Sequence, residues 1–230
     1  MTAKHRVGDF PLILIAGGAS HRMGMPKGLL PIKGRPFLYW QLSRFRAAGG
    51  TRAIVVTGAD AVAYRETLAV VAQAEEREIR RQDVCSGLAI RVVENASYEL
   101  GPLSSLQKAI ELYSESEYRE ALGAFFSPID VPLPAPSVWT ELASSFSMRR
   151  SVIKPTYKNR GGHPILMNDL FLQSLRDVDL DGEEARLDLQ IRRLPAEQVL
   201  RCSVEERSVT LNLNTPEEFL RWVESSDHMD

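Results

Sequence analysis

The sequence predicts an α/β protein with a mostly parallel sheet between layers of helices. Short apolar runs alternate with helix-length amphipathic segments as far as Asp130, and a glycine or polar residue directly follows several of those runs. Alternation of this kind is typical of parallel strands whose connecting helices pack on both faces of the sheet. No linker or repeat interrupts the pattern, so we expect one domain over residues 1–224 and a short tail at 225–230.

The apolar runs are short and bounded by turn residues, which favours buried strands. The expected strands are Leu12–Ala16, Ala53–Thr57, Ala89–Val93, Ala121–Phe126, Ser151–Lys154 and Pro164–Met167. The expected helices are Pro36–Ala48, Ala61–Arg81, Leu103–Tyr113 and a segment near Ser137–Phe146.

Ligands of open α/β sheets bind at the carboxyl ends of the strands, near a change in strand order. If the first four runs are parallel, the residues that follow them meet on one rim of the sheet. We therefore expect the site at Gly17, Gly58, Asn95 and Asp130.

Composition excludes several classes of protein. The chain has 230 residues, 44% hydrophobic and 25% charged, with a net charge of −2, which argues against a general nucleic-acid binder. Cys85 and Cys202 are too few and too far apart for a metal cluster or a disulfide framework, so we expect reduced thiols. No run approaches the roughly 20 apolar residues of a membrane span, and Met1–Asp9 lacks the apolar core of a signal peptide. We expect a cytoplasmic protein that binds no membrane.

The first apolar run ends in a glycine-rich basic loop. Phe10–Ala16 stops at Gly17-Gly18, and the residues that follow carry Arg22 and Lys27. Paired glycines let the backbone turn tightly and approach a ligand without interference from Cβ. Free N–H groups in such a loop, together with Arg and Lys, form a concave anion site suited to a polyphosphate.

Two familiar glycine motifs fail on spacing. A P-loop requires Gly-Lys-Ser/Thr, but Gly24 is followed by Met25. The dinucleotide fingerprint requires Gly-x-Gly-x-x-Gly and an acid about twenty residues later. The glycines of this loop miss that spacing, and the second predicted strand ends at Thr57-Gly58 without an acid.

Asp130 is a candidate metal ligand because it comes just after the fourth predicted strand. Mg²⁺ prefers one or two carboxylates and keeps its other positions for water and phosphate oxygens. The alternative is a helix N-cap. Pro132 and Pro134 delay the next helix, which favours the metal. Further on, Asn214 or Thr215 is predicted to cap a helix that has Pro at its first position and Glu218 near its third.

The glycine loop also resembles a known signature. Ile15–Lys27 matches Leu-x-Gly-Gly-x-Ser-x-Arg-Met-Gly-x-x-Lys, with Ile for the leading Leu, and Leu29–Pro36 continues it as Leu-Leu-Pro-x-x-Gly-x-Pro. The chain thus resembles the MobA/MocA-like nucleotidyltransferases, which move a nucleotide from an NTP to molybdopterin or another small phosphorylated acceptor. The resemblance implies a Rossmann-like three-layer domain of the nucleotide-diphospho-sugar transferase type. It implies NTP binding by Ala16, Gly17, Gly18, Ser20, Arg22, Gly24, Lys27, Asn95, Gly101 and Ser105.

The same resemblance implies catalytic and metal roles. Arg22 and Lys27 would stabilise charge on the phosphates, and Asp130, in the family's Pro-x-Asp-x-Pro motif, would hold Mg²⁺. Asn214 precedes Thr-Pro-Glu, where many relatives place a carboxylate near the metal, and whether it or Asn212 contacts the metal stays open. Near Asn95, capping of the helix that starts after Gly101 is an alternative role for Ser104 and Ser105.

A last segment, Lys154–Pro164, resembles the family's Pro-x-Tyr-x-x-Arg-x-Gly-His-Pro stretch, which faces the acceptor. A hairpin turn at Gly161-Gly162 explains those glycines equally well. His163 is interpreted as a positioning residue, because an acceptor phosphate is already anionic near neutral pH. The predicted acceptor-binding residues are Lys154, Lys158, Arg160 and His163.

The resemblance therefore predicts an Mg²⁺-dependent nucleotidyltransferase that releases pyrophosphate. Gly-Gly and Asn-x-Asn-Thr-Pro resemble guanylyltransferases and Gly-His-Pro resembles cytidylyltransferases, so GTP is only slightly favoured over CTP. Molybdopterin is the expected acceptor, with a molybdoenzyme or its chaperone left open as a protein partner. One alternative is a sugar-1-phosphate or polyol-phosphate nucleotidyltransferase. Another, of a different class, is a nucleotide-binding protein for molybdoenzyme assembly that has no turnover.

Overall fold

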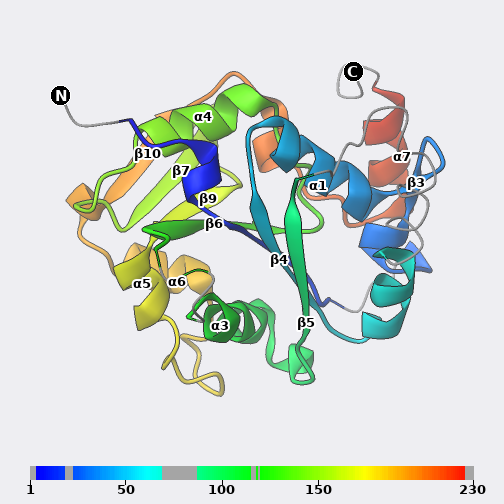
Figure 1. Cartoon of the computed structure of the whole chain (residues 1–230), viewed down its shortest axis with the longest axis horizontal. Helices are drawn as coiled ribbons and strands as arrows, with labels where there is room; N and C mark the ends of the chain where they lie inside the picture. The colour runs from blue at the N-terminus through cyan, green and yellow to red at the C-terminus, as the bar shows by residue number, and fades with distance from the viewer. Residues whose placement is uncertain (1–3, 19–22, 69–86, 115–117, 119, 226–230) are drawn as a thin grey trace.

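A computed structural model describes residues 4–18, 23–68, 87–114, 118 and 120–225. Its centre is an eight-stranded sheet in the order β10-β7-β9-β6-β1-β4-β5, with β8 paired to β7 (Figure 1). The strands of this sheet are β1 (Leu12–Ala16), β4 (Arg52–Thr57), β5 (Ala89–Glu94), β6 (Gly123–Pro128), β7 (Val152–Tyr157), β8 (Arg160–Gly161), β9 (Ile165–Asn168) and β10 (Val199–Ser203). A separate two-stranded ribbon is formed by β2 (Pro31–Ile32) and β3 (Arg35–Pro36).

The sheet is mostly parallel, as predicted. β1 pairs in parallel with both β4 and β6, β4 with β5, and β7 with β10. β9 runs antiparallel to both of its neighbours, β6 and β7. Because β1, β4, β5 and β6 share one direction, the residues that follow them lie on one rim, where the sequence analysis expected the site.

Helices cover both faces of the sheet (Figure 1). α1 and α4 pack with Leu12 and Leu14 of β1 in one hydrophobic core, and α3 and α5 pack with Ile13 and Ile15 in the other. Alternation along β1 therefore supplies both cores. The helices are 61–68, α1 (Phe37–Ala47), α3 (Pro102–Tyr113), α4 (Pro136–Ser144), α5 (Asp169–Ser174), α6 (Leu187–Arg192) and α7 (Pro216–Glu224). The 3-10 turns are η1 (Val7–Asp9), η3 (Lys27–Leu29), η4 (Tyr98–Leu100), η6 (Ala196–Gln198) and η7 (Arg207–Thr210).

A third hydrophobic cluster joins the end of the chain to α1. Phe37 of α1 makes edge contacts with Phe219 and Trp222 of α7, with ring centroids 5.5 Å apart in both pairs. Edge-to-face aromatic pairs of this kind add to the stability gained from burial. α7 is thereby fixed against α1, which places the loop before it beside the rim of the sheet.

Two predictions about local structure are corrected. The hairpin turn expected at Gly161-Gly162 instead falls at Lys158 and Asn159, which both have positive φ. Gly162 is required for another reason, since a Cβ there would lie 2.2 Å from the carbonyl oxygen of Val209. The strand expected from Ala121 begins at Gly123.

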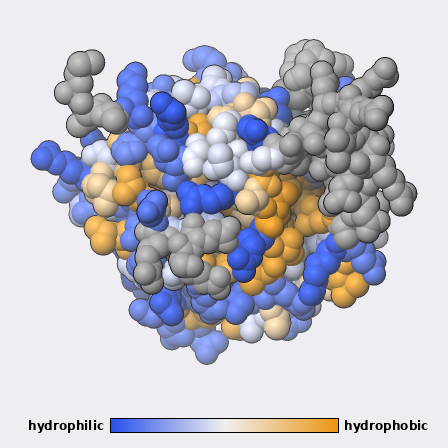
Figure 2. All heavy atoms as spheres, in the orientation of Figure 1, coloured by the Kyte–Doolittle hydropathy of each residue, from blue (hydrophilic) through white to orange (hydrophobic). Residues whose placement is uncertain are grey.

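Other expectations fall partly outside the described residues. The predicted helix Ala61–Arg81 is described only over 61–68, and the predicted tail, 225–230, only at Ser225. None of the helices in the described ranges is long and apolar enough to cross a membrane. On the side of the molecule that Figures 1 and 2 show, hydrophobic and hydrophilic residues are mixed at the surface. A hydrophobic area lies where Figure 1 places the edge strand β5.

Candidate active site

Asp130 lies in a loop that leaves the sheet directly after β6. The N–H of Ile129 donates to the carbonyl of Ile15 in β1, which holds the start of the loop on the sheet. The fully buried side chain of Gln41, from α1, donates to the carbonyls of Ile129 and Val131 at 3.1 and 2.8 Å. Its own oxygen accepts from the N–H of Leu133 at 2.7 Å. Gln41 thus fixes the backbone on both sides of Asp130.

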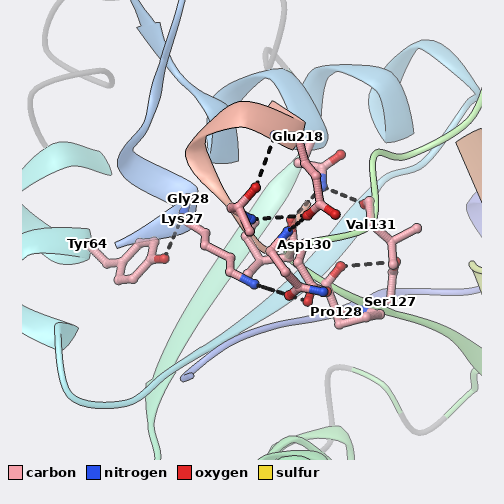
Figure 3. A network of polar contacts seen from close by, with 12 residues as sticks. Lys27, Gly28, Tyr64, Ser127, Pro128, Asp130, Val131 and Glu218 are labelled. Carbon is pink, nitrogen blue, oxygen red and sulfur yellow. Dashed lines mark hydrogen bonds and ion pairs between the residues drawn. The ribbon is translucent and has the colours of Figure 1, made fainter. Parts of the chain in front are cut away.

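Lys27, Asp130 and Asn214 meet at one point (Figure 3). The Lys27 ammonium lies 3.2 Å from Asp130 Oδ2 and 2.8 Å from Asn214 Oδ1. The side chains of Lys27 and Asp130 are only 17% and 24% exposed, so water screens their attraction less than at a fully exposed surface. Asp130 and Asn214 follow Lys27 by 103 and 187 positions in the sequence, yet the three side chains form one cluster.

The loop before α7 is locked in place by both backbone and cap. The N–H of Leu213 donates to the carbonyl of Asp130 at 2.8 Å. Thr215 caps α7 in a capping box with Glu218, whose carboxylate also accepts from the N–H of Asn214. The predicted cap is confirmed at Thr215, and it leaves the side chain of Asn214 directed to Lys27.

The cluster fits a divalent cation. Asp130 Oδ2 and Asn214 Oδ1 both lie within hydrogen-bond distance of the Lys27 ammonium. The two oxygens therefore converge on a positive charge. Within the described part of the chain, no group of three or more His, Cys, Asp or Glu side chains could hold a metal. One carboxylate, an amide oxygen, water and substrate phosphates make a donor set that Mg²⁺ accepts.

The glycine loop approaches its neighbours closely on one side and is open on the other. A Cβ at Gly58 would lie 2.3 Å from the carbonyl oxygen of Gly17, so this contact requires glycine at the end of β4. Gly18 is exposed with nothing near its would-be Cβ, and Gly24 adopts positive φ. An added Cβ at Gly18 or Gly24 would meet no described atom within 4 Å. Ser20 and Arg22, predicted for the same loop, lie outside the described residues.

Lys27 is held by packing of its own turn. The N–H of Gly28 donates to the hydroxyl of Tyr64 at 3.1 Å, and a Cβ at Gly28 would lie 2.6 Å from the Tyr64 ring. Burial raises the pKa of Tyr64 to about 12, so the phenol stays protonated. Tyr64 therefore fixes the backbone next to Lys27.

Asn95 and the two predicted serines form a buried network. The Asn95 amide donates to Ser104 Oγ at 2.8 Å and to Ser105 Oγ at 3.0 Å. Neither serine caps α3: the N-cap is Gly101, with φ of 94° and no side-chain cap, and Ser104 Oγ donates to its carbonyl. The capping alternative is corrected accordingly, because these side chains bind one another and fix the loop after β5 to α3.

A cleft of about 1070 Å³ runs from Asp130 across the sheet to α6 and β10. Phe126 and Ile165 belong to its apolar wall, and Asn212 lines it beside Asp130. Of the predicted acceptor residues, Lys154 and His163 line this cleft. The lining also includes charged residues that sequence reasoning missed: Arg186, Asp188, Arg192 and Arg201.

The other two predicted acceptor residues are Lys158 and Arg160. Both are exposed on the β7–β8 hairpin, and neither lines the cleft. The hairpin turn at Lys158 and Asn159 places the two cations at its tip. The family motif located the segment, but the turn determines which of its cations reach the cleft.

His163 is neutral at physiological pH. Burial lowers the pKa of His163 to about 4, although a backbone hydrogen bond with Phe126 and the charge of Asp130 both act to raise it. Its Nδ1 is buried and makes no hydrogen bond within the described residues. A neutral, fixed imidazole suits the positioning role predicted for it.

Comparison with known proteins assigns the chain to a family. The sequence model of the MobA-like NTP transferase domain matches residues 12–194. No curated protein sequence matches the chain. Among solved structures, Rv0371c from Mycobacterium tuberculosis superposes with a TM-score of 0.71 at 22% identity, covering 94% of this chain and 98% of that one. A second structure of Rv0371c is a complex with manganese.

Two archaeal structures show the same fold. A nucleotidyl transferase from Methanothermobacter gives a TM-score of 0.64 at 18% identity, covering 94% of this chain and 96% of that one. Molybdopterin-guanine dinucleotide biosynthesis protein A from Archaeoglobus fulgidus gives a TM-score of 0.59 at 17% identity, covering 94% of this chain and 97% of that one. The fold and the family match define a nucleotidyltransferase of Rossmann-like α/β architecture. Within that class, the chain belongs to the MobA-like NTP transferase family.

Proposed function

We propose that residues 1–224 form an Mg²⁺-dependent nucleotidyltransferase domain that moves an NMP from an NTP to a small phosphorylated acceptor. The observation that carries this proposal is the convergence of the Lys27, Asp130 and Asn214 side chains at the loop that follows β6. In this proposal the cluster supplies a cation site, and the Lys27 side chain brings its ammonium to the triphosphate. GTP, slightly favoured over CTP, is the proposed donor, and molybdopterin the proposed acceptor.

In the proposed reaction, an acceptor phosphate oxygen attacks the α-phosphorus of the NTP. The bond from that phosphorus to the β-bridging oxygen breaks, and its electrons leave with pyrophosphate. The backbone from Gly17 to Gly24 binds the triphosphate, and Arg22 and Lys27 stabilise the charge that moves to the leaving group. Mg²⁺, held by Asp130 and Asn214, neutralises phosphate charge when bound.

The remaining residues orient the reactants. No proton has to be removed from an acceptor phosphate near neutral pH, so neutral His163 is proposed to position the acceptor without acting as a base. Asn95, Gly101 and Ser105 are proposed to shape the nucleoside side through the loop that they fix. Catalysis then depends on orientation and electrostatics.

A panel of pyrophosphate-release assays tests the proposal. Each NTP is combined with Mg²⁺ and with molybdopterin, a sugar 1-phosphate or a polyol phosphate, using the full chain. We expect release with one NTP and a phosphorylated acceptor, and a loss of at least about a hundredfold in kcat for Lys27→Ala. Absence of release in every combination, or normal turnover in Lys27→Ala, contradicts the proposal.

A further inference from the structure

The cleft contains a pair of cations that the proposed chemistry at Asp130 does not use. Lys154 of β7 and Arg201 of β10 are register partners on neighbouring parallel strands, and both line the cleft. Like charges directly opposite each other on adjacent strands destabilise a sheet. Both cations nevertheless face the same cleft.

No carboxylate in the described part of the chain forms an ion pair with Lys154 or Arg201. Asp188 does form ion pairs in this cleft, but with Arg186 at 3.1 Å and Arg192 at 3.4 Å. Burial and then the charges of Arg201 and Arg192 lower the pKa of Lys154, while the charge of Asp188 acts to raise it. The positive potential at this end of the cleft is therefore only partly compensated by the protein.

Glycine leaves room for the Lys154 side chain. A Cβ at Gly161 of β8 would lie 3.1 Å from Lys154 Nζ and 3.3 Å from its Cε. The ammonium thus lies against bare backbone at the edge of the cleft.

The cation pair lies on strands away from the one that leads into Asp130. In the sheet, β6, which leads into Asp130, is two strands from β7 and three from β10. Strand spacing puts these axes about 10 and 14 Å apart. Phe126 of β6 and Ile165 of β9, the strand between β6 and β7, also line the cleft.

We infer, resting on the proposed transfer to a small phosphorylated acceptor but not on molybdopterin as that acceptor, that the acceptor carries a second anionic group, a carboxylate or phosphate, bound by Lys154 and Arg201. The acceptor's attacking phosphate lies at the Asp130 end, its apolar body packs over Phe126 and Ile165, and the second anion reaches the cation pair. The volume of the cleft suits a ligand of that size, because small-molecule pockets span roughly 300–1,000 Å³. A monoanionic acceptor with an uncharged far end leaves the repulsion between the two cations unrelieved.

Two matched probes test this inference without any nucleotide. The affinities of 2-naphthyl phosphate and 6-carboxy-2-naphthyl phosphate are measured by calorimetry on the full chain. We expect the carboxylated probe to bind at least about tenfold more tightly, the effect of a charge-assisted hydrogen bond. That preference is expected to disappear in Arg201→Gln and Lys154→Gln, and to persist in Arg176→Gln, an exposed control outside the cleft.

Thermal unfolding separates lost binding from misfolding. Without ligand, Arg201→Gln is expected to unfold at a temperature no lower than the unsubstituted chain, because it removes a like-charge contact. Equal affinity for the two probes, binding of neither, or a preference that survives in both cleft variants overturns the inference. The two claims can fail separately. If the chain prefers the carboxylated probe but releases no pyrophosphate from any NTP, the anion site is supported and the proposed function is contradicted.

Discussion

Gln41→Leu is expected to uncouple Asp130 from the scaffold. The substitution keeps a buried side chain of similar size but removes both hydrogen bonds to carbonyls and the one from the Leu133 N–H. A buried polar group left unsatisfied costs about 1–3 kcal/mol. With partial relaxation of the loop, we expect a loss of about 3 kcal/mol in the free energy of unfolding. For a chain of this size that corresponds to a fall of roughly 6–12 °C in Tm.

The same change is expected to reduce turnover, because a misplacement of about 1 Å can lower a rate about a hundredfold. Gln107→Leu is the matched control: Gln107 also donates to two carbonyls, those of Leu175 and Val178, but it belongs to α3, on the opposite face of the sheet from α1. Thermal melts and pyrophosphate release are measured for both variants. Both should lose stability, and only Gln41→Leu should lose kcat. Equal kcat losses, or an unchanged kcat in Gln41→Leu, refute the positioning role.

Three further changes have defined outcomes. Asn214→Asp adds a carboxylate to the cation site, so the Mg²⁺ concentration for half-maximal pyrophosphate release should fall several-fold; an increase argues against metal binding there. His163 binds a proton near pH 6.5 when unfolded but only near pH 4 when folded, so stability should fall by up to about 3 kcal/mol as pH drops through that window. Urea unfolding checks this, and a pH dependence unchanged in His163→Phe contradicts it. Gly162→Ala places a methyl against the Val209 carbonyl and should cost about 1–3 kcal/mol by the same unfolding measurement; a neutral effect counts against the close contact.

The parts of the fold that the sequence predicts are those governed by local pattern. β1 has the predicted bounds because a continuous apolar run ends at glycines, and its alternating residues supply both cores. Asp130 could be found because it follows such a run, and the cap at Thr215 because its partner Glu218 is three residues away. In each case the determining contacts are close in sequence.

The rest depends on contacts between distant segments. In the sequence, Gln41 is one polar residue among others in an amphipathic helix. Only the packing of α1 shows that its side chain binds the loop that carries Asp130. Arg201 belongs to β10, a short strand that no apolar run marks, and it meets Lys154 through sheet pairing. Lys158 lies at the turn of the β7–β8 hairpin, and the motif does not specify where that hairpin turns.

Transfer of label from an α-³²P-labelled NTP tests the central claim most directly. With Mg²⁺ and the phosphorylated acceptor identified by the panel, the account predicts that the α-label appears in the acceptor while a γ-label is released as pyrophosphate. Asp130→Asn should abolish that transfer in a folded protein. Label that reaches the acceptor only from the γ-position, or α-label transfer that persists in Asp130→Asn, would contradict the account.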